Sequence, residues 1–202
     1  MHRLKCKCGA VQGHVLDGSP SSRVRCYCTD CQAFGRYVGS EARVLDAQGG
    51  TEIVQVCQSR LRFERGLEQL ASVRLTDKGM IRWYSKCCRT PLGNTMADPK
   101  MSFVGLIHSS LDLLSLDRDF GNSIALLNTS TALGEPKPQQ RGSIGMILRF
   151  AKLLLASRIL GRYRETPLFS STGAPISAPT VLAAAELERL KSVASPFIGA
   201  HA

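Results

Sequence analysis

The stretch RCYCTDCQAF, residues 25–34, holds three cysteines within six positions: Cys26, Cys28 and Cys31. A disulfide within the Cys-X-Cys pair of Cys26 and Cys28 is unfavourable, because bridged Cα atoms must lie about 4.4–6.8 Å apart with correctly aimed Cβ vectors. Three thiolates can instead converge on one tetrahedral zinc ion, which takes sulfur ligands at about 2.3 Å. Three protein ligands leave the fourth position open, as a catalytic or substrate-binding zinc requires. The stretch therefore predicts an open zinc site.

Four of the other five cysteines form two further groups. Cys6 and Cys8 lie in KCKCGAVQG, and Cys87 and Cys88 lie in WYSKCCRTPLGN. Both groups lie beside predicted strands that could pair, so they predict a closed four-sulfur site that joins distant parts of a β domain. Cys57 stands alone and is predicted to be a small buried hydrophobe.

The composition is normal for a soluble globular protein. The 202 residues suit one domain with an appendage or two small domains, and 44% of them are hydrophobic. No apolar run reaches the roughly 18 residues of a membrane span, and the start MHRLKCKCGAVQGHV lacks the apolar core of a secretory signal. We expect a cytoplasmic protein with reduced thiols, in which eight cysteines indicate metal or thiol chemistry before disulfides.

The first 135 residues predict a mainly β fold. Apolar and polar side chains alternate as in half-buried strands, and turn residues separate the runs. The predicted strands are residues 10–15, 21–28, 51–57, 61–65, 71–75, 80–85 and 102–108. Residues 29–34 predict a single helical turn after the strand that leads into the cysteine cluster. This spacing of short strands favours a β-sandwich or an irregular β-sheet domain.

A change of composition at residue 134 marks the end of the predicted β domain. We divide the chain into a zinc-binding β domain at residues 1–133, a linker at 134–142 and a helical extension at 143–202. Residues 143–163 predict a helix, and residues 181–192 predict a last helix with Thr180 as its N-cap. The first helix is expected to pack on the β domain through an apolar stripe of Ile144, Ile147, Leu148, Leu154 and Leu155.

The formal net charge of +10 is concentrated toward the C-terminal end, where residues 136–202 carry nine basic and three acidic side chains. Such a segment could attract nucleic acid, an acidic membrane or anionic metabolites, or form a solvated surface. Nucleic acid is disfavoured because aromatic residues are few and no zinc-finger spacing occurs. Membrane insertion is disfavoured because Arg149 and Lys152 would each cost roughly 2.5–3.5 kcal/mol at the bilayer centre, whereas contact with a membrane surface stays open.

Several catalytic motifs are missing from the sequence. The absence of HExxH, paired-carboxylate and Gly-rich phosphate-binding motifs argues against a protease, a glycosidase and a nucleotide-binding protein. His14 and His108 fall in strand-like runs and are predicted to be core histidines rather than ligands. Arg23, Arg25 and Arg36 lie close to the open cluster in sequence, so they are candidates for holding carboxylates of a ligand, with exposed solvated arginines as the alternative.

Taken in order, CKCGAV, RCYCTDCQ and CCRTPLG resemble the glutathione-dependent formaldehyde-activating enzyme (GFA) family, also called the centromere protein V/GFA domain. That family reads C-X-C-G, then C-X-C-X-X-C, then C-X-X-C-G-[ST]-P-L, and the resemblance covers roughly residues 2–130. It implies a zinc-stapled fold of the β-tent type with two zinc ions. Cys6 and Cys8 would form the structural site with the third group, and the middle group would form the three-cysteine site.

The third motif departs from the family pattern. Cys88 matches its last cysteine, but its first cysteine falls on Ser85 and its glycine falls on Arg89. Cys87 is the obvious replacement, but adjacent side chains point opposite ways in an extended segment, so a local turn is needed. The structural site is therefore either the four cysteines Cys6, Cys8, Cys87 and Cys88, or three thiolates completed by Ser85 or water.

The resemblance implies a carbon–sulfur lyase-type activity on a thiol–aldehyde adduct, with a thiol such as glutathione at the three-cysteine zinc site. The alternative is a non-catalytic, zinc-stabilised binding module whose basic C-terminal helix docks on a membrane or a protein partner. No side chain stands out for proton transfer, so the sequence assigns metal ligands and no catalytic residue.

Overall fold

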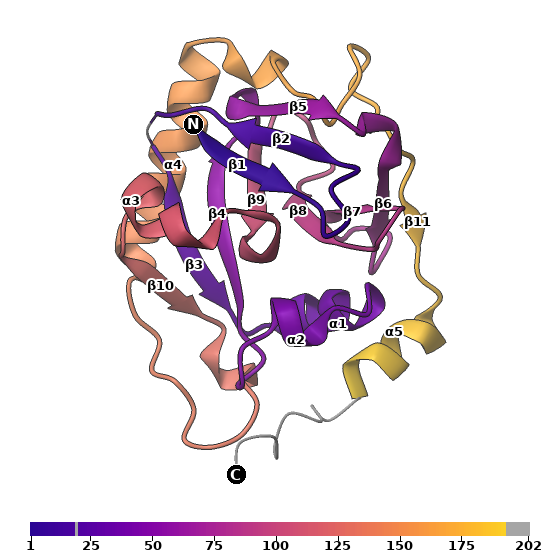
Figure 1. Cartoon of the computed structure of the whole chain (residues 1–202). Helices are drawn as coiled ribbons and strands as arrows, with labels where there is room; N and C mark the ends of the chain where they lie inside the picture. Colours follow the sequence, from indigo (N-terminus) through magenta and orange to yellow (C-terminus); the bar gives the residue numbers. More distant parts are fainter. Residues whose placement is uncertain (19, 193–202) are drawn as a thin grey trace.

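Two β-sheets form the centre of the computed structural model, which describes residues 1–18 and 20–192 (Figure 1). The strands are β1 (His2–Lys5), β2 (Gln12–Val15), β3 (Ser22–Cys26), β4 (Thr51–Cys57), β5 (Leu61–Arg65), β6 (Leu70–Arg74), β7 (Ile81–Ser85), β8 (Pro91–Thr95), β9 (Phe103–Ile107), β10 (Ile124–Leu127) and β11 (Thr180–Val181). The helices are α1 (Thr29–Tyr37), α2 (Glu41–Val44), α3 (Leu116–Phe120), α4 (Ser143–Ile159) and α5 (Ala184–Ser192).

The smaller sheet has the order β1-β2-β5, and the larger one has the order β10-β3-β4-β9-β8-β7-β6-β11. The two edge strands β10 and β11 run parallel to β3 and β6, and the inner pairs of the large sheet are antiparallel. The chain is therefore rich in β structure, as predicted, and combines a large mixed sheet with helices.

The large sheet is buried on both faces. Along β4, Val54 and Val56 belong to the core shared with the small sheet, while Ile53 and Cys57 belong to clusters on the opposite face. Helices α1 and α5 pack together on the opposite face, next to residues of β6 and β9 (Figure 1). Because side chains of a strand alternate between faces, one sheet can hold the main core on one side and a binding site on the other. Cys57 is buried, as predicted.

The predicted strands are confirmed: residues 51–57 and 61–65 match β4 and β5 at both ends, and the other strands differ by at most two residues at either end. The helical turn predicted for residues 29–34 begins the longer helix α1, whose N-cap is Cys28. The last helix begins at Ala184 and not at residue 181, because Thr180 and Val181 pair with β6. The sequence missed β1, β8, β10 and β11, which are short strands with no extended alternation of their own.

Helix α4 forms within the predicted range, but the predicted packing stripe was wrong. Four of its five residues, Ile144, Ile147, Leu148 and Leu155, are exposed. The helix contacts the large sheet through another face, where Leu153 and Ser157 are buried. The physical reason is that the helix is apolar on nearly every side, so its periodicity alone does not select the buried face.

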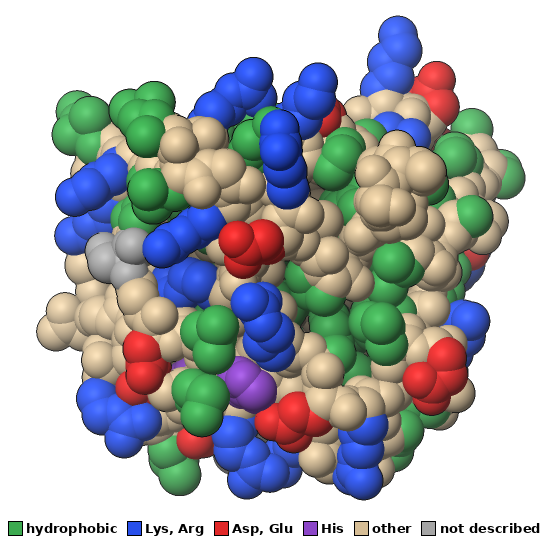
Figure 2. Space-filling view, turned by 90° about the horizontal axis from the view of Figure 1, so that it is seen from above, with side chains coloured by type: hydrophobic (Ala, Val, Ile, Leu, Met, Phe, Trp, Pro, Cys, Tyr) green, Lys and Arg blue, Asp and Glu red, His purple; other side chains and the backbone are tan. Residues whose placement is uncertain are grey.

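Among residues 1–18 and 20–192, no helix has both the length and the apolar character needed to cross a bilayer. Seen from above, the molecule presents many Lys and Arg side chains with hydrophobic side chains between them (Figure 2).

The division of the chain into a domain, a linker and an extension stays a prediction.

Candidate metal centres

Cys26, Cys28 and Cys31 meet where β3 ends and α1 begins. Cys26 is the last residue of β3, Cys28 caps the N-terminus of α1, and Cys31 lies in the first turn of the helix. The three Sγ atoms lie within 4.8 Å of one another, so this group could hold a metal ion. The change from strand to helix brings residues two and five positions apart to one point, which explains the spacing of the motif.

Several donors surround these sulfurs. The Cys31 N–H donates to Cys28 Sγ at 3.4 Å, the Asn128 amide donates to Cys26 Sγ at 3.3 Å, and Arg82 Nη1 lies 4.0 Å from Cys31 Sγ. Hydrogen bonds from the thiols of Cys28 and Cys31 lower the pKa of Cys26 to about 2, against the opposing effect of burial. The positive end of α1 favours negative sulfur as well. Cys26 is therefore suited to be a thiolate, the form that binds zinc, whereas the contact with Cys26 raises the pKa values of Cys28 and Cys31.

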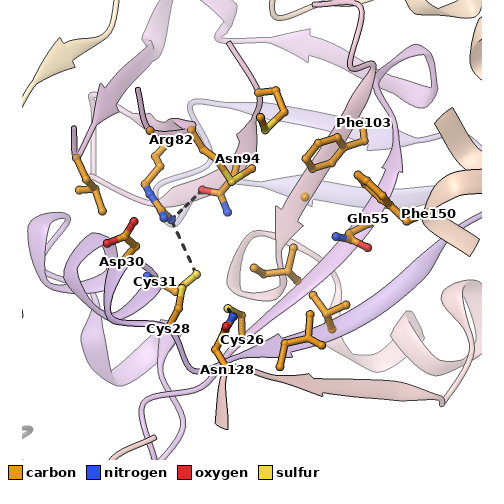
Figure 3. A pocket seen from close by; sticks show the side chains of 18 of the residues that line it. Cys26, Cys28, Asp30, Cys31, Gln55, Arg82, Asn94, Phe103, Asn128 and Phe150 are labelled. Carbon is orange, nitrogen blue, oxygen red and sulfur yellow. Dashed lines mark hydrogen bonds between the residues drawn. The ribbon is translucent and has the colours of Figure 1, made fainter. Parts of the chain in front are cut away.

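A cavity of about 400 Å³ adjoins the three cysteines (Figure 3). It lies on the face of the large sheet away from the small sheet. Arg82 and Asn94 lie near the sulfur end, joined by a hydrogen bond of 3.4 Å from Arg82 Nη1 to Asn94 Oδ1. Phe103 and Phe150 lie across the cavity from the cysteines, Phe103 on β9 and Phe150 on α4. The cavity thus has a polar sulfur end and an apolar aromatic end.

The second group combines two turns that are distant in sequence. Cys6 and Cys8 lie between β1 and β2, and Cys87 and Cys88 lie between β7 and β8. The Sγ–Sγ distances are 3.5 Å for Cys6–Cys8, 3.8 Å for Cys6–Cys87, 3.3 Å for Cys8–Cys87 and 3.9 Å for Cys87–Cys88. A tetrahedral ion with zinc–sulfur bonds of about 2.3 Å separates its sulfurs by about 3.8 Å. The four sulfurs therefore fit a zinc ion without large movement.

A local turn brings the adjacent cysteines Cys87 and Cys88 into the same group. The Arg89 N–H donates to the Ser85 carbonyl at 2.9 Å, and Arg89 has a φ of 52°, in the left-handed region. A glycine adopts this conformation without strain, which explains why the family pattern has glycine here. The Arg89 guanidinium lies over the rings of Tyr37 and Tyr84, at 4.9 and 5.6 Å from their centroids.

Ser85 does not occupy the position of the fourth ligand. Its Oγ accepts a hydrogen bond from the Thr90 N–H at 3.1 Å and lies 3.4 Å from Cys88 Sγ. The Thr90 hydroxyl lies 3.2 Å from the same sulfur. Burial raises the pKa of the Cys88 thiol, but these two hydroxyls outweigh it and hold that pKa at about 5. Ser85 therefore supports Cys88, and Cys87 supplies the fourth sulfur of the group.

The three arginines proposed to hold ligand carboxylates do not line the cavity. Arg23 donates to Glu52 from Nε at 2.9 Å, and Arg25 donates to the other carboxylate oxygen of Glu52 at 3.2 Å. Arg36 donates to Glu41 at 2.8 Å. The prediction was wrong for this cavity, because carboxylates of the protein itself already pair with these guanidinium groups.

The sequence missed the arginine that does face the cavity. Arg82 lies in a predicted strand, next to Trp83, which points into the main core. Alternation puts Arg82 on the other face, where an arginine is usually exposed. Helix α1 covers that face, and the Phe34 ring centroid lies 5.4 Å from the guanidinium carbon, so Arg82 is buried. Only the packing of α1 on the sheet reveals this.

Neither histidine singled out in the sequence joins a cysteine group. His108 Nδ1 lies 3.1 Å from the Glu52 carbonyl oxygen, and burial lowers the pKa of His108. His14 Nδ1 lies 2.9 Å from Glu64 Oε1. Among the described residues, the two groups able to hold a metal consist of cysteines alone.

Comparison with known proteins places the chain in a family. Residues 1–178 match the model described as "Family of unknown function (DUF6151)". The chain belongs to the DUF6151 family. The match is not to the GFA family that the motifs resemble, although the two cysteine groups are consistent with zinc sites of that type.

No curated protein matches the chain. Among solved structures, a crystal structure of a Rhodobacter sphaeroides protein, a structural genomics target, is similar to it. That protein is 22% identical, the alignment covers 60% of this chain and 97% of that chain, and the TM-score is 0.41.

Proposed function

We propose that this DUF6151 protein holds two zinc ions and binds a small thiol at the three-cysteine site for carbon–sulfur lyase-type chemistry. One observation carries the proposal: Cys26, Cys28 and Cys31 line a cavity of about 400 Å³. A set of three thiolates needs a fourth ligand, and the adjoining cavity gives a ligand sulfur access to it. The four-cysteine group, by contrast, is a complete ligand set.

The four-cysteine group would be the structural site of a zinc-stapled, β-tent-type domain. It joins Cys6, beside the small sheet, to Cys87, beside the large sheet, across 81 positions of sequence. A metal bound only in the folded state stabilises that state by its binding free energy. We therefore assign it a role in stability and none in the reaction.

Zinc in the three-cysteine site would act as a Lewis acid and favour the thiolate form of a bound thiol. Asn128 and the N-terminus of α1 stabilise the negative charge on Cys26 and Cys28. Arg82 is buried beside Cys31 and presents N–H donors that can bind a carbonyl oxygen or a carboxylate of the ligand. These residues orient the ligand, and no proton-transfer residue is assigned.

The far wall of the cavity favours an apolar group on the ligand. Phe103 and Phe150 lie there, and the cavity lining also includes Met80, Met96 and Met101. Methionine side chains adapt to differently shaped apolar groups, and the aromatic rings bury flat or branched ones. Glutathione has two carboxylates, whereas Arg82 is the one basic residue in this lining. Because one end of the cavity holds the sulfurs and the other is apolar, we place the thiol at the sulfur end and the apolar part of the aldehyde between the phenylalanines.

The test uses cobalt in place of zinc, because Co²⁺ occupies zinc sites and its visible absorption reports its ligands. Protein loaded with two cobalt ions is titrated with glutathione and with a benzyl thiol. We expect both thiols to change the spectrum, and the benzyl thiol to bind at least about tenfold more tightly, as its ring reaches the apolar end.

Two variants locate the response. Cys28→Ser should keep one cobalt ion and lose the response to thiols, whereas Cys57→Ser, a buried cysteine outside both groups, should keep both ions and the response. A spectrum that no thiol changes in the two-cobalt protein would refute the proposed thiol site. Release of aldehyde from a thiol–aldehyde adduct then measures the lyase reaction itself.

A second candidate function is a zinc-stabilised binding module without catalysis. The observation that favours it is the exposed apolar side of α4, described below. A protein that holds both metal ions, ignores thiols and releases no aldehyde would fit this function instead.

A further inference from the structure

Helix α4 leaves one of its faces uncovered. Its outer face consists of Ile144, Ile147, Leu148, Ala151, Leu155 and Ile159, and the five large side chains are each more than half exposed. Spacings of three, four and seven residues place them along one side of the helix. The opposite side packs on the large sheet through Leu153 and Ser157. A contiguous apolar surface of this kind marks an interaction site more often than a solvated surface.

The charges around this face all have the same sign. Residues 136–164 contain seven Lys and Arg residues and no Asp or Glu. On α4 itself, Arg149, Lys152 and Arg158 are exposed, and none of them forms an ion pair within the described chain. In the view from above, one group of hydrophobic side chains lies at the upper left, with Lys and Arg side chains beside it (Figure 2).

We infer that the outer face of α4 docks on the surface of an anionic lipid bilayer, with the helix lying in the plane of the membrane. The apolar side chains would enter the boundary between headgroups and acyl chains, while the flanking cations contact anionic headgroups. Lys and Arg are suited to this place because their stems are apolar and their charged ends can reach outward. Tyr163, which lies between Arg158 and Arg164, adds an aromatic side chain of the type enriched at membrane interfaces.

The geometry of α4 favours lying on the membrane over spanning it. Its 17 residues are about 25 Å long, which is shorter than the about 30 Å of a hydrocarbon core. Its other face is already packed on the protein. Docking therefore needs no rearrangement of the fold, and it is independent of the chemistry proposed for the cavity.

A second copy of this chain fits the same face less well. In a two-fold symmetric pair, the same face of the helix meets itself, whether the two helices run parallel or antiparallel. Lys152 lies close to the middle of the outer face, so the two lysines would face each other, and no carboxylate within residues 136–164 could neutralise them. Like charges at the centre of a contact disfavour it, whereas an anionic lipid surface neutralises the same charges.

The experiment is co-sedimentation of the zinc-loaded full chain with vesicles. Vesicles of phosphatidylcholine alone are compared with vesicles that contain about 30% phosphatidylserine, at about 0.1 M and about 1 M salt. We expect the protein to bind the anionic vesicles at least tenfold more strongly than vesicles of phosphatidylcholine alone. Binding to the anionic vesicles should fall strongly at high salt. The double variant Leu148→Ser/Leu155→Ser should lose at least tenfold in binding and keep its melting temperature.

Leu67→Ser is the matched control, because Leu67 is an exposed leucine in the short helical turn Leu67–Gln69, away from α4. It should bind as the unchanged protein does. Failure to bind anionic vesicles, or equal binding by the double variant, would overturn the inference. A concentration-dependent dimer that disappears in the double variant would overturn it too, by assigning the face to a second copy.

Discussion

Cys87 and Cys88 illustrate how one turn changes the role of two adjacent residues. In the GFA motif that the third cysteine group resembles, the last cysteine falls on Cys88. That register alone predicts a larger loss of zinc affinity for Cys88→Ser than for Cys87→Ser. The structure places Cys87 Sγ 3.3 Å from Cys8 Sγ and 3.8 Å from Cys6 Sγ, while Cys88 belongs to the same group. Each residue therefore contributes one of four thiolates.

We predict comparable losses for Cys87→Ser and Cys88→Ser. Each should weaken zinc binding at this site by more than the roughly 10–100-fold typical of losing a supporting residue, because a direct ligand is removed. Competition with a chromogenic zinc chelator measures the affinity, and Cys57→Ser serves as the control. A loss confined to Cys88→Ser would show that Cys87 is not a ligand.

Arg89 combines a strained backbone with favourable ring contacts. Its left-handed conformation costs about 1–2 kcal/mol in a residue other than glycine, and a cation over an aromatic ring contributes about 0.5–1 kcal/mol at an exposed site. Arg89→Ala keeps the strain and loses the contact with Tyr37, whereas Arg89→Gly loses both. We predict that Arg89→Gly is about 1 kcal/mol more stable than Arg89→Ala in urea unfolding of the zinc-loaded protein. Equal stabilities would mean that the turn relaxes around the alanine.

At the scale of the element, α4 shows that the periodicity of apolar residues does not by itself predict which face of a helix is buried. The buried side of α4 is the one on which Leu153 contacts Phe103 and Cys57 of the large sheet. We predict that Leu153→Ala destabilises the protein by about 2–5 kcal/mol, because it leaves a cavity in this cluster. Leu148→Ala, on the outer face, should change stability by no more than about 0.5 kcal/mol. Thermal unfolding measures both, and a reversed order would mean that the helix packs through its outer face.

At the scale of the whole molecule, the two cysteine groups differ in what they connect. The four-cysteine group closes a long loop between two sheets, while the three-cysteine group lies within residues 26–31. A metal bound across two sheets stabilises the folded arrangement of both, whereas a metal bound within one short segment stabilises a local turn. We predict two zinc ions per chain in the unchanged protein and one in each of Cys8→Ser and Cys28→Ser.

The two variants should differ in stability. Cys8→Ser should lower the melting temperature markedly and Cys28→Ser should leave the fold largely intact, because only the first removes a link between the sheets. Elemental analysis gives the zinc content, and circular dichroism gives the melting temperature. Unfolding by Cys28→Ser beside an unaffected Cys8→Ser would reverse the roles of the two sites.

Local sequence pattern predicts the features that depend on neighbouring residues. The alternation in residues 51–57 and 61–65 predicts β4 and β5, because the two faces of a strand have different surroundings. The spacing of Cys26, Cys28 and Cys31 predicts one sulfur cluster, because side chains within six positions of one another stay close whatever the rest of the fold. The resemblance to the GFA motifs, and not local pattern, predicts that Cys6 and Cys8 share a site with the third group, and it leaves Cys87 and Ser85 as alternatives there.

Which surfaces are covered depends on the packing of segments that are distant in the sequence. Arg82 faces a cavity because α1 packs over one side of β7, and Arg23 is unavailable to a ligand because β3 pairs with β4 and brings Glu52 beside it. The outer face of α4 is open because the sheet accommodates the opposite side of the helix. Each of these depends on contacts between segments far apart in the chain, and local periodicity contains no information about which segment will lie opposite.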